Sequence, residues 1–96
     1  METNHEQLHA VVEGRVQAVG FRVFVYEQAQ ALNLTGWVRN LRSGSVEVLA
    51  EGPPTNLAAL LERIRKGPRG ALVTNVSVEW DTAKGDFNTF EIEPTA

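Results

Sequence analysis

The sequence predicts an α+β sandwich, in which an antiparallel sheet carries two helices on one of its faces. The chain has 96 residues, of which 43% are hydrophobic, and this suits one domain with a single core. Two segments have apolar residues at helical spacing, and the segments between them alternate or are β-prone. Their order is strand, helix, strand, strand, helix and strand, with a short strand added.

The first half of the chain supplies a strand, a helix and a hairpin. Apolar residues alternate through residues 8–12, which predicts a strand. The apolar positions of residues 21–32 recur at helical spacing, and this helix should end near Asn33. Residues 35–40 and 46–51 are β-prone and flank a short turn that contains glycine. They therefore predict a β-hairpin.

The second half supplies the other helix and the closing strands. Leucine or isoleucine stands at positions 57, 60, 61 and 64, the spacing of an amphipathic helix, which Gly67 and Pro68 end. Residues 72–81 alternate as a strand does, and residues 87–92 predict a last short strand. Two strand–helix–strand units with right-handed crossovers interleave into a split βαβ sheet, which is the ferredoxin-like fold.

The charge of the chain is unevenly distributed. The formal net charge is −3, which argues against a general nucleic-acid binder. Residues 14–44 carry four basic side chains and one acidic side chain, whereas the remainder carries five basic and eleven acidic ones. A basic segment in an acidic protein favours the attraction of a small anion. The numbers are small, so chance segregation is the alternative.

Composition excludes several other classes. Residues 1–7 are polar and lack the apolar region of a signal peptide, so they predict a flexible leader before a domain of residues 8–93. No run reaches the roughly 18 apolar residues of a membrane span. The absence of cysteine excludes disulfides and cysteine-ligated metals, and the two histidines, His5 and His9, are expected to be solvated. We expect a cytoplasmic protein without membrane, nucleic-acid, metal or cofactor partners.

Residues 14–22, with the sequence GRVQAVGFR, connect the first strand to the first helix. Unpaired backbone N–H groups at a helix N-terminus attract anions, and Gly14 and Gly20 let the backbone turn tightly. Arg22 adds a planar guanidinium suited to phosphate oxygens. The stretch predicts a phosphate site, although it lacks the Gly-Lys-Ser/Thr of a P-loop. The alternative is an ordinary turn with solvated arginines.

Asn40 falls near the end of the second strand, where the fold can bring it to the same loop. An amide can accept from a water and donate to an oxygen, so Asn40 can orient a water for in-line attack on phosphorus. The alternative role is that of a turn residue. No general acid stands nearby, which favours an acyl phosphate, because its carboxylate leaving group has a pKa of about 4 to 5.

Two motifs resemble those of the acylphosphatase family, namely GRVQAVGFR at residues 14–22 and GWVRNLRSGSVE at residues 36–47. The resemblance spans residues 8–93. It implies the ferredoxin-like fold and hydrolysis of acyl phosphates to a carboxylate and inorganic phosphate, without metal or cofactor. It also implies two catalytic residues. Arg22 would bind the phosphoryl group, and Asn40 would orient the attacking water.

The resemblance further implies that backbone N–H groups of the loop bind the substrate. These belong to Arg15, Val16, Gln17, Ala18, Val19 and Gly20. Two positions depart from the family pattern, which usually has glycine at Ala18 and Asp or Asn at Ser43. We expect the loop to keep its shape with a negative φ at Ala18, because only glycine takes positive φ without strain. We also expect a monomer that binds inorganic phosphate as product and inhibitor.

Two other functions fit parts of the sequence. Acylphosphatase-like domains also occur in larger proteins, where they bind acyl phosphates for another reaction, and turnover by the isolated chain would distinguish the two. RNA-recognition domains share the strand order but need aromatic residues on their central strands. Residues 8–12 and 46–50 contain none, which argues against RNA binding.

Overall fold

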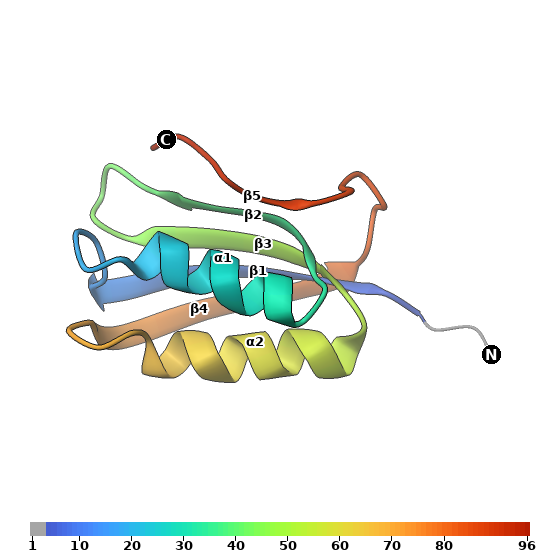
Figure 1. The fold of residues 1–96 in the computed structure, drawn as a ribbon, viewed down its shortest axis with the longest axis horizontal. Coiled ribbons are helices and arrows are strands. Elements are labelled where there is room, and N and C mark those ends of the chain that lie inside the picture. Colours follow the sequence, from blue (N-terminus) through green and yellow to red (C-terminus); the bar gives the residue numbers. More distant parts are fainter. Residues whose placement is uncertain (1–3) are drawn as a thin grey trace.

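The computed structural model describes residues 4–96, whose arrangement is shown in Figure 1. Strands and helices follow one another in the predicted order, with a short strand at the end. Their bounds are Glu6–Arg15 for β1, Phe21–Ala31 for α1, Thr35–Asn40 for β2, Val46–Gly52 for β3, Pro54–Lys66 for α2, Leu72–Thr82 for β4 and Phe90–Ile92 for β5. The helix α1 ends as predicted, with Asn33 left-handed at a φ of 56° just beyond it.

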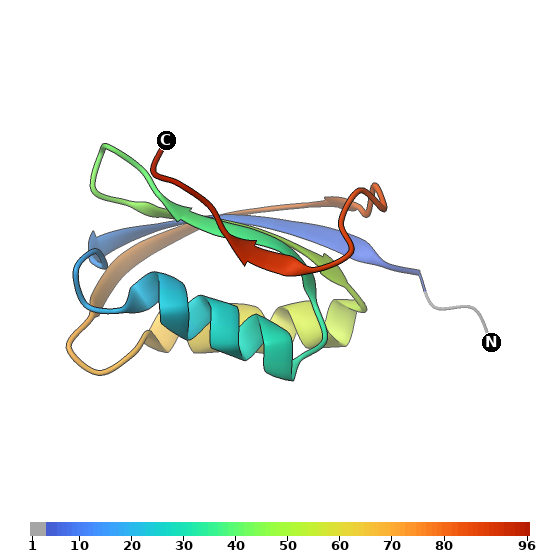
Figure 2. The ribbon, with the colours of Figure 1, turned by 45° about the horizontal axis from the view of Figure 1, so that its top comes forward.

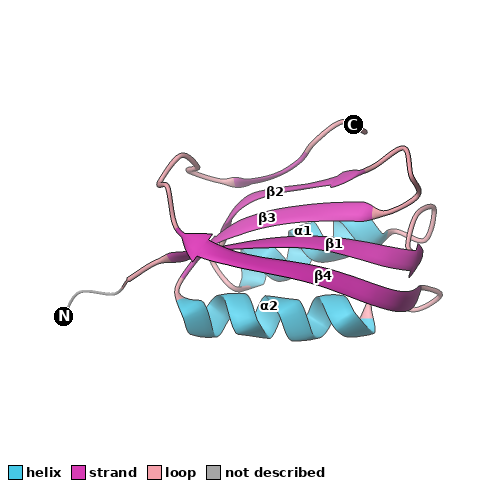
Figure 3. Ribbon diagram, turned by 180° about the vertical axis from the view of Figure 1, so that it is seen from behind, coloured by secondary structure: helices cyan, strands magenta, loops and turns pink. Residues whose placement is uncertain are grey.

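The strands form one sheet with the order β4-β1-β3-β2-β5. The pairs β4-β1, β1-β3 and β3-β2 are antiparallel, whereas β5 pairs parallel with β2 at the edge. Both helices cover the same face of the sheet and leave the other face open (Figure 2 and Figure 3). The predicted ferredoxin-like sandwich is therefore confirmed.

The hydrophobic core lies between the sheet and the helices. Alternate residues of β1, such as Leu8 and Val12, face the helices and are fully buried, as the period of a strand requires. From the other side, α2 presents Leu57, Leu60 and Ile64, which are also fully buried. Two different periods, one of the strand and one of the helix, thus build a single apolar layer.

The predicted leader is wrong at its last two residues. β1 begins at Glu6, which pairs with Gly52 of β3 and Thr82 of β4. Both neighbouring strands extend past residue 8, so their backbone groups offer partners to this polar stretch of chain. Residues 1–3 of the predicted leader lie outside the described residues.

The last strand is shorter than predicted, because it begins at Phe90 rather than Phe87. Residues 83–89 instead carry the chain from β4 at one edge of the sheet to β5 at the other. Glu51 of β3 holds this crossing segment. Its carboxylate is buried and accepts hydrogen bonds from the backbone N–H groups of Lys84 at 2.9 Å and Gly85 at 3.1 Å.

Candidate active site

Three connections meet at one end of the sheet, seen on the left of Figure 1. They are residues 16–20 between β1 and α1, residues 41–45 between β2 and β3, and residues 67–71 between α2 and β4. The strand β2 ends here with Asn40, so the structure brings Asn40 to the loop and helix start that contain Arg22. Together they line a small hollow of about 80 Å³. The lining residues are Val16, Gln17, Ala18, Gly20, Phe21, Arg22, Val23 and Asn40.

The start of α1 is open to an anion. The first helical hydrogen bond runs from the Phe24 N–H to the Gly20 carbonyl at 3.0 Å, so the N–H groups of residues 21–23 have no partner within the helix. Gly20, at the N-cap, is left-handed with a φ of 76°, and no side chain caps the helix. The first turn also contains no acidic residue. The positive end of the helix dipole therefore faces the hollow without an internal counter-charge.

The expectation of a negative φ at Ala18 is wrong, because its φ is 61°. Residues 16–20 must reverse the chain from a strand into a helix within five residues. The backbone does this with left-handed conformations at both Ala18 and Gly20, and the second of these falls on a glycine. At Ala18 the Cβ atom makes the conformation unfavourable by about 1 kcal/mol. The loop thus stores backbone strain beside the hollow.

Arg22 lies in the first turn of α1 and lines the hollow. Within residues 4–96, it forms no ion pair with a carboxylate. Arg39, only one residue before Asn40, differs in this respect. Its Nε donates to Glu47 at 2.8 Å, and its guanidinium stacks 4.5 Å from the centre of the Trp37 ring. Arg22 therefore keeps its planar set of donors for a ligand, whereas Arg39 uses its donors inside the protein.

The side chain of Asn40 points to the helix face of the sheet, where its neighbour across the ladder, Val46, is buried. Its Oδ1 atom is buried and has no hydrogen-bond partner among the described residues. A buried unpaired acceptor is rare, because it loses its hydration without compensation. The turn after Asn40 closes through backbone bonds, including Leu41 N–H to Ser45 O at 2.9 Å. The turn therefore does not use the amide, which remains available to a ligand or a water.

The predicted loop residues divide into two groups. Val16, Gln17, Ala18 and Gly20 line the hollow, whereas Arg15 and Val19 do not. Arg15 belongs to β1 and pairs with Leu72 of β4, and Val19 packs against the core. A role of their backbone N–H groups stays a prediction.

One contact of the site was missed by the sequence analysis. The Gln17 side chain donates from Nε2 to the carbonyl oxygens of Leu41 and Ser45, each at 2.8 Å. From the sequence, only the backbone N–H of Gln17 is predicted to take part in the site. Backbone carbonyls carry no residue-specific signal, so no pattern in the chain indicates this contact.

The open face of the sheet carries a paired carboxylate. Glu47 accepts from His9 at 2.7 Å and from Arg39 at 2.8 Å. Burial alone would raise the pKa of the Glu47 carboxyl, but these hydrogen bonds and charges outweigh it and lower the pKa below its ordinary value. Within residues 4–96, no three potential metal ligands lie together, and neither helix has the length and hydrophobicity needed to span a bilayer.

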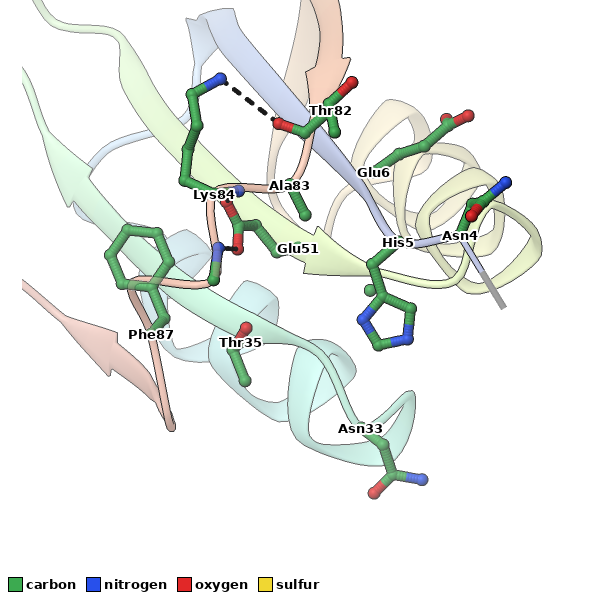
Figure 4. A pocket seen from close by; sticks show the side chains of 12 residues that line it. Asn4, His5, Glu6, Asn33, Thr35, Glu51, Thr82, Ala83, Lys84 and Phe87 are labelled. Atoms are coloured by element: carbon green, nitrogen blue, oxygen red, sulfur yellow. Dashed lines mark hydrogen bonds between the residues drawn. The ribbon is translucent and has the colours of Figure 1, made fainter. Parts of the chain in front are cut away.

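A much larger groove lies at the opposite end of the sheet, with a volume of about 750 Å³. Figure 4 shows Glu51 in it, beside the chain at Ala83 and Lys84. Two charged groups of this groove have partners, since Glu51 accepts three hydrogen bonds and the Lys84 Nζ lies 2.9 Å from Asp81. Among the described residues, the groove contains no buried side-chain polar atom without a hydrogen bond, whereas the small hollow is lined by Asn40, whose Oδ1 is such an atom.

Known proteins resemble this chain in both sequence and fold. A family model described as Acylphosphatase matches residues 8–92. An acylphosphatase of Salinibacter ruber is 46% identical over 93 residues, which cover 96% of this chain and 98% of that protein. The crystal structure of acylphosphatase from Bacillus subtilis matches with a TM-score of 0.89 and 40% identity, over 92% of this chain and 98% of that one. Full-length HypF, in a phosphate- and nucleotide-bound form, matches with a TM-score of 0.90 and 28% identity, over 99% of this chain and 13% of HypF. The chain therefore belongs to the acylphosphatase family.

Proposed function

We propose that this acylphosphatase hydrolyses the carboxyl–phosphate bond of small acyl phosphates with Arg22 and Asn40 in separate roles. Arg22 and the N–H groups at the start of α1 bind the phosphoryl oxygens. Asn40 orients the water. The observation that carries the proposal is that Asn40, whose buried Oδ1 has no hydrogen-bond partner within residues 4–96, lines the same hollow as Arg22, which has no ion pair within those residues.

The reaction requires little from the protein beyond position and charge. The water oxygen attacks phosphorus on the side opposite the acyl oxygen, and the bond between phosphorus and that oxygen breaks. The leaving carboxylate takes the bond electrons and needs no proton, because its pKa is about 4 to 5. The proton lost by the water passes to an oxygen of the transferred phosphate. Guanidinium and helix N–H donors stabilise the negative charge on the equatorial oxygens.

A comparison of two substrates tests this proposal. Benzoyl phosphate and phenyl phosphate present the same phosphoryl group with a carboxylate and a phenolate as leaving groups. Because the site offers no acid to protonate a leaving group, we expect rapid turnover of benzoyl phosphate and little of phenyl phosphate. Hydrolysis of phenyl phosphate alone would contradict the proposal. Stoichiometric binding of benzoyl phosphate without turnover would favour the binding module instead.

Inorganic phosphate should bind in the hollow as a product and compete with the substrate. Titration followed by the NMR shifts of the Arg22 and Gly20 backbone amides measures this binding, and competitive inhibition kinetics measures its consequence. We further propose that the protein acts as a monomer in the cytoplasm. Light scattering and cell fractionation test these two predictions.

A further inference from the structure

The side chain of Gln17 joins the loop at residues 16–20 to the turn at residues 41–45. We infer that Gln17 is a positioning residue, which holds Asn40 in place relative to the bound phosphate. This inference rests on the proposed function, because it assigns Gln17 a part in the same reaction. It concerns the side-chain amide, not the backbone N–H that the loop offers to phosphate.

The geometry of the contact is suited to this role. The amide nitrogen of Gln17 has two protons, and its two acceptors, Leu41 O and Ser45 O, are each 2.8 Å away. Leu41 directly follows Asn40, and Ser45 directly precedes Val46, which pairs with Asn40 across the ladder. Gln17 therefore holds both strands of the hairpin immediately beside the Asn40–Val46 pair.

Other contacts fix Asn40 only to its own sheet and to the C-terminal residue Ala96. Its carbonyl oxygen accepts from the Ala96 N–H at 3.0 Å, and the ladder joins it to Val46. Its Oδ1 atom makes no hydrogen bond within residues 4–96. The Gln17 bonds are thus the side-chain hydrogen bonds that connect the hairpin to the loop, within the described part of the chain. Without them, the distance between the water at Asn40 and the phosphorus is held only by packing.

Kinetics of three variants test the inference. In Gln17→Met, which keeps the length of the side chain but has no donor, we expect kcat to fall about 10- to 100-fold, as for a displacement of about 1 Å. The affinity for inorganic phosphate should change by less than about twofold, because the loop N–H groups remain. In an Asn40→Ala background the same change should lower kcat by less than about twofold, since the water is no longer oriented.

The outcomes are distinguishable. Equal losses of kcat in both backgrounds, or an unchanged kcat in Gln17→Met, would overturn the inference while leaving the proposed function intact. A wild-type chain without turnover of benzoyl phosphate would overturn both. Gln30→Met is the matched control, because the one side-chain hydrogen bond of Gln30 within residues 4–96 goes to Tyr26 on the exposed side of α1, at 3.0 Å. Its kcat should equal that of the wild type.

A second variant covers the case in which Gln17→Met does not fold. Gln17→Glu has the shape of the native side chain, but its carboxylate faces two carbonyl oxygens without a proton to donate. Protonation restores one donor, so kcat relative to the wild type should rise as the pH falls through the pKa of the new carboxyl. A ratio of kcat that does not vary with pH would show that the side chain has no positioning role.

Discussion

The buried polar side chains at the two ends of the sheet differ in whether they have hydrogen-bond partners. At the end with the small hollow, Asn40 Oδ1 has no hydrogen-bond partner and Arg22 has no ion pair within residues 4–96. Ala18 adds a left-handed backbone there. At the other end Glu51 is buried, and its carboxylate accepts hydrogen bonds from Gln7, Lys84 and Gly85.

The difference shows which structural feature indicates function in this molecule. The groove at the Glu51 end is much the larger, at about 750 Å³ against about 80 Å³. Its buried carboxylate, Glu51, stabilises the fold because its hydrogen bonds are satisfied. The small hollow holds groups whose partners are missing, and such groups lower stability unless a ligand completes them. Substitutions at the two ends should therefore separate activity from stability.

The largest effect is expected for Arg22→Lys. Lysine keeps the charge but replaces a planar set of donors by a point charge, so we expect kcat/KM to fall about 10³-fold and phosphate to bind more weakly. Arg39→Lys makes the same change at a paired arginine on the open face and should keep its activity. Unchanged phosphate affinity in a folded Arg22→Lys variant would show that Arg22 does not bind the phosphate.

Asn40→Ala should lower kcat by about 10²- to 10³-fold, by analogy with the loss of one positioned group in an oxyanion hole. Phosphate affinity should remain, because the proposed partner of Asn40 is the water. The free energy of unfolding should not fall, since the substitution removes an unpaired buried acceptor. Steady-state kinetics, phosphate titration and urea denaturation measure the three quantities. Normal kcat in a folded variant would show that Asn40 is a turn residue and does not orient the water.

Glu51→Gln should have the opposite profile. The amide nitrogen would replace a carboxylate oxygen that accepts a hydrogen bond from a backbone N–H, so two donors would face each other. We therefore expect the free energy of unfolding to fall by about 1–3 kcal/mol while kcat is unchanged. Burial alone would raise the pKa of Glu51, but hydrogen bonds from the Lys84 and Gly85 N–H groups and from Gln7 hold it below its ordinary value. Urea denaturation and steady-state kinetics at neutral pH test this separation.

The lowered pKa of Glu51 also makes the free energy of unfolding depend on pH. A carboxyl group with a lower pKa in the folded state contributes stability above its ordinary value of 4.5, and this stability is lost as the pH falls through the folded-state pKa. As the pH falls below about 5, the free energy of unfolding should therefore decrease less in Glu51→Gln than in the wild type. Urea denaturation at a series of pH values measures this. An identical pH dependence in the two proteins would show that Glu51 does not contribute.

Ala18→Gly should have the smallest effect, a gain of about 1 kcal/mol or less in the free energy of unfolding. Glycine relieves the strain of a positive φ, and the added freedom of the unfolded chain offsets part of this gain. Ala58→Gly, on the exposed side of α2, is the matched control and should lose up to about 1 kcal/mol. Thermal unfolding compares them. A loss of stability in Ala18→Gly would show that the strain of the left-handed alanine is smaller than the entropy that glycine adds to the unfolded chain.

Several features of this protein were determined by the sequence alone. The alternation of β1 and the spacing of Leu57, Leu60 and Ile64 predict the layers correctly, because each element carries its own period and must bury its apolar side. The positions of Arg22 and Asn40 also follow from the sequence, since a helix start and a strand end are local features. Their motifs resemble the family to which the chain belongs.

Other features were decided by the tertiary structure. The left-handed Ala18 results from the distance and direction between β1 and α1, which one residue type does not reveal. The Gln17 contacts with the hairpin and the Glu51 contacts with residues 84 and 85 both involve backbone groups, which every residue possesses. The extension of β1 to Glu6 depends on the lengths of its neighbours. In the last three cases the partner is far away in the chain, so only the folded arrangement selects it.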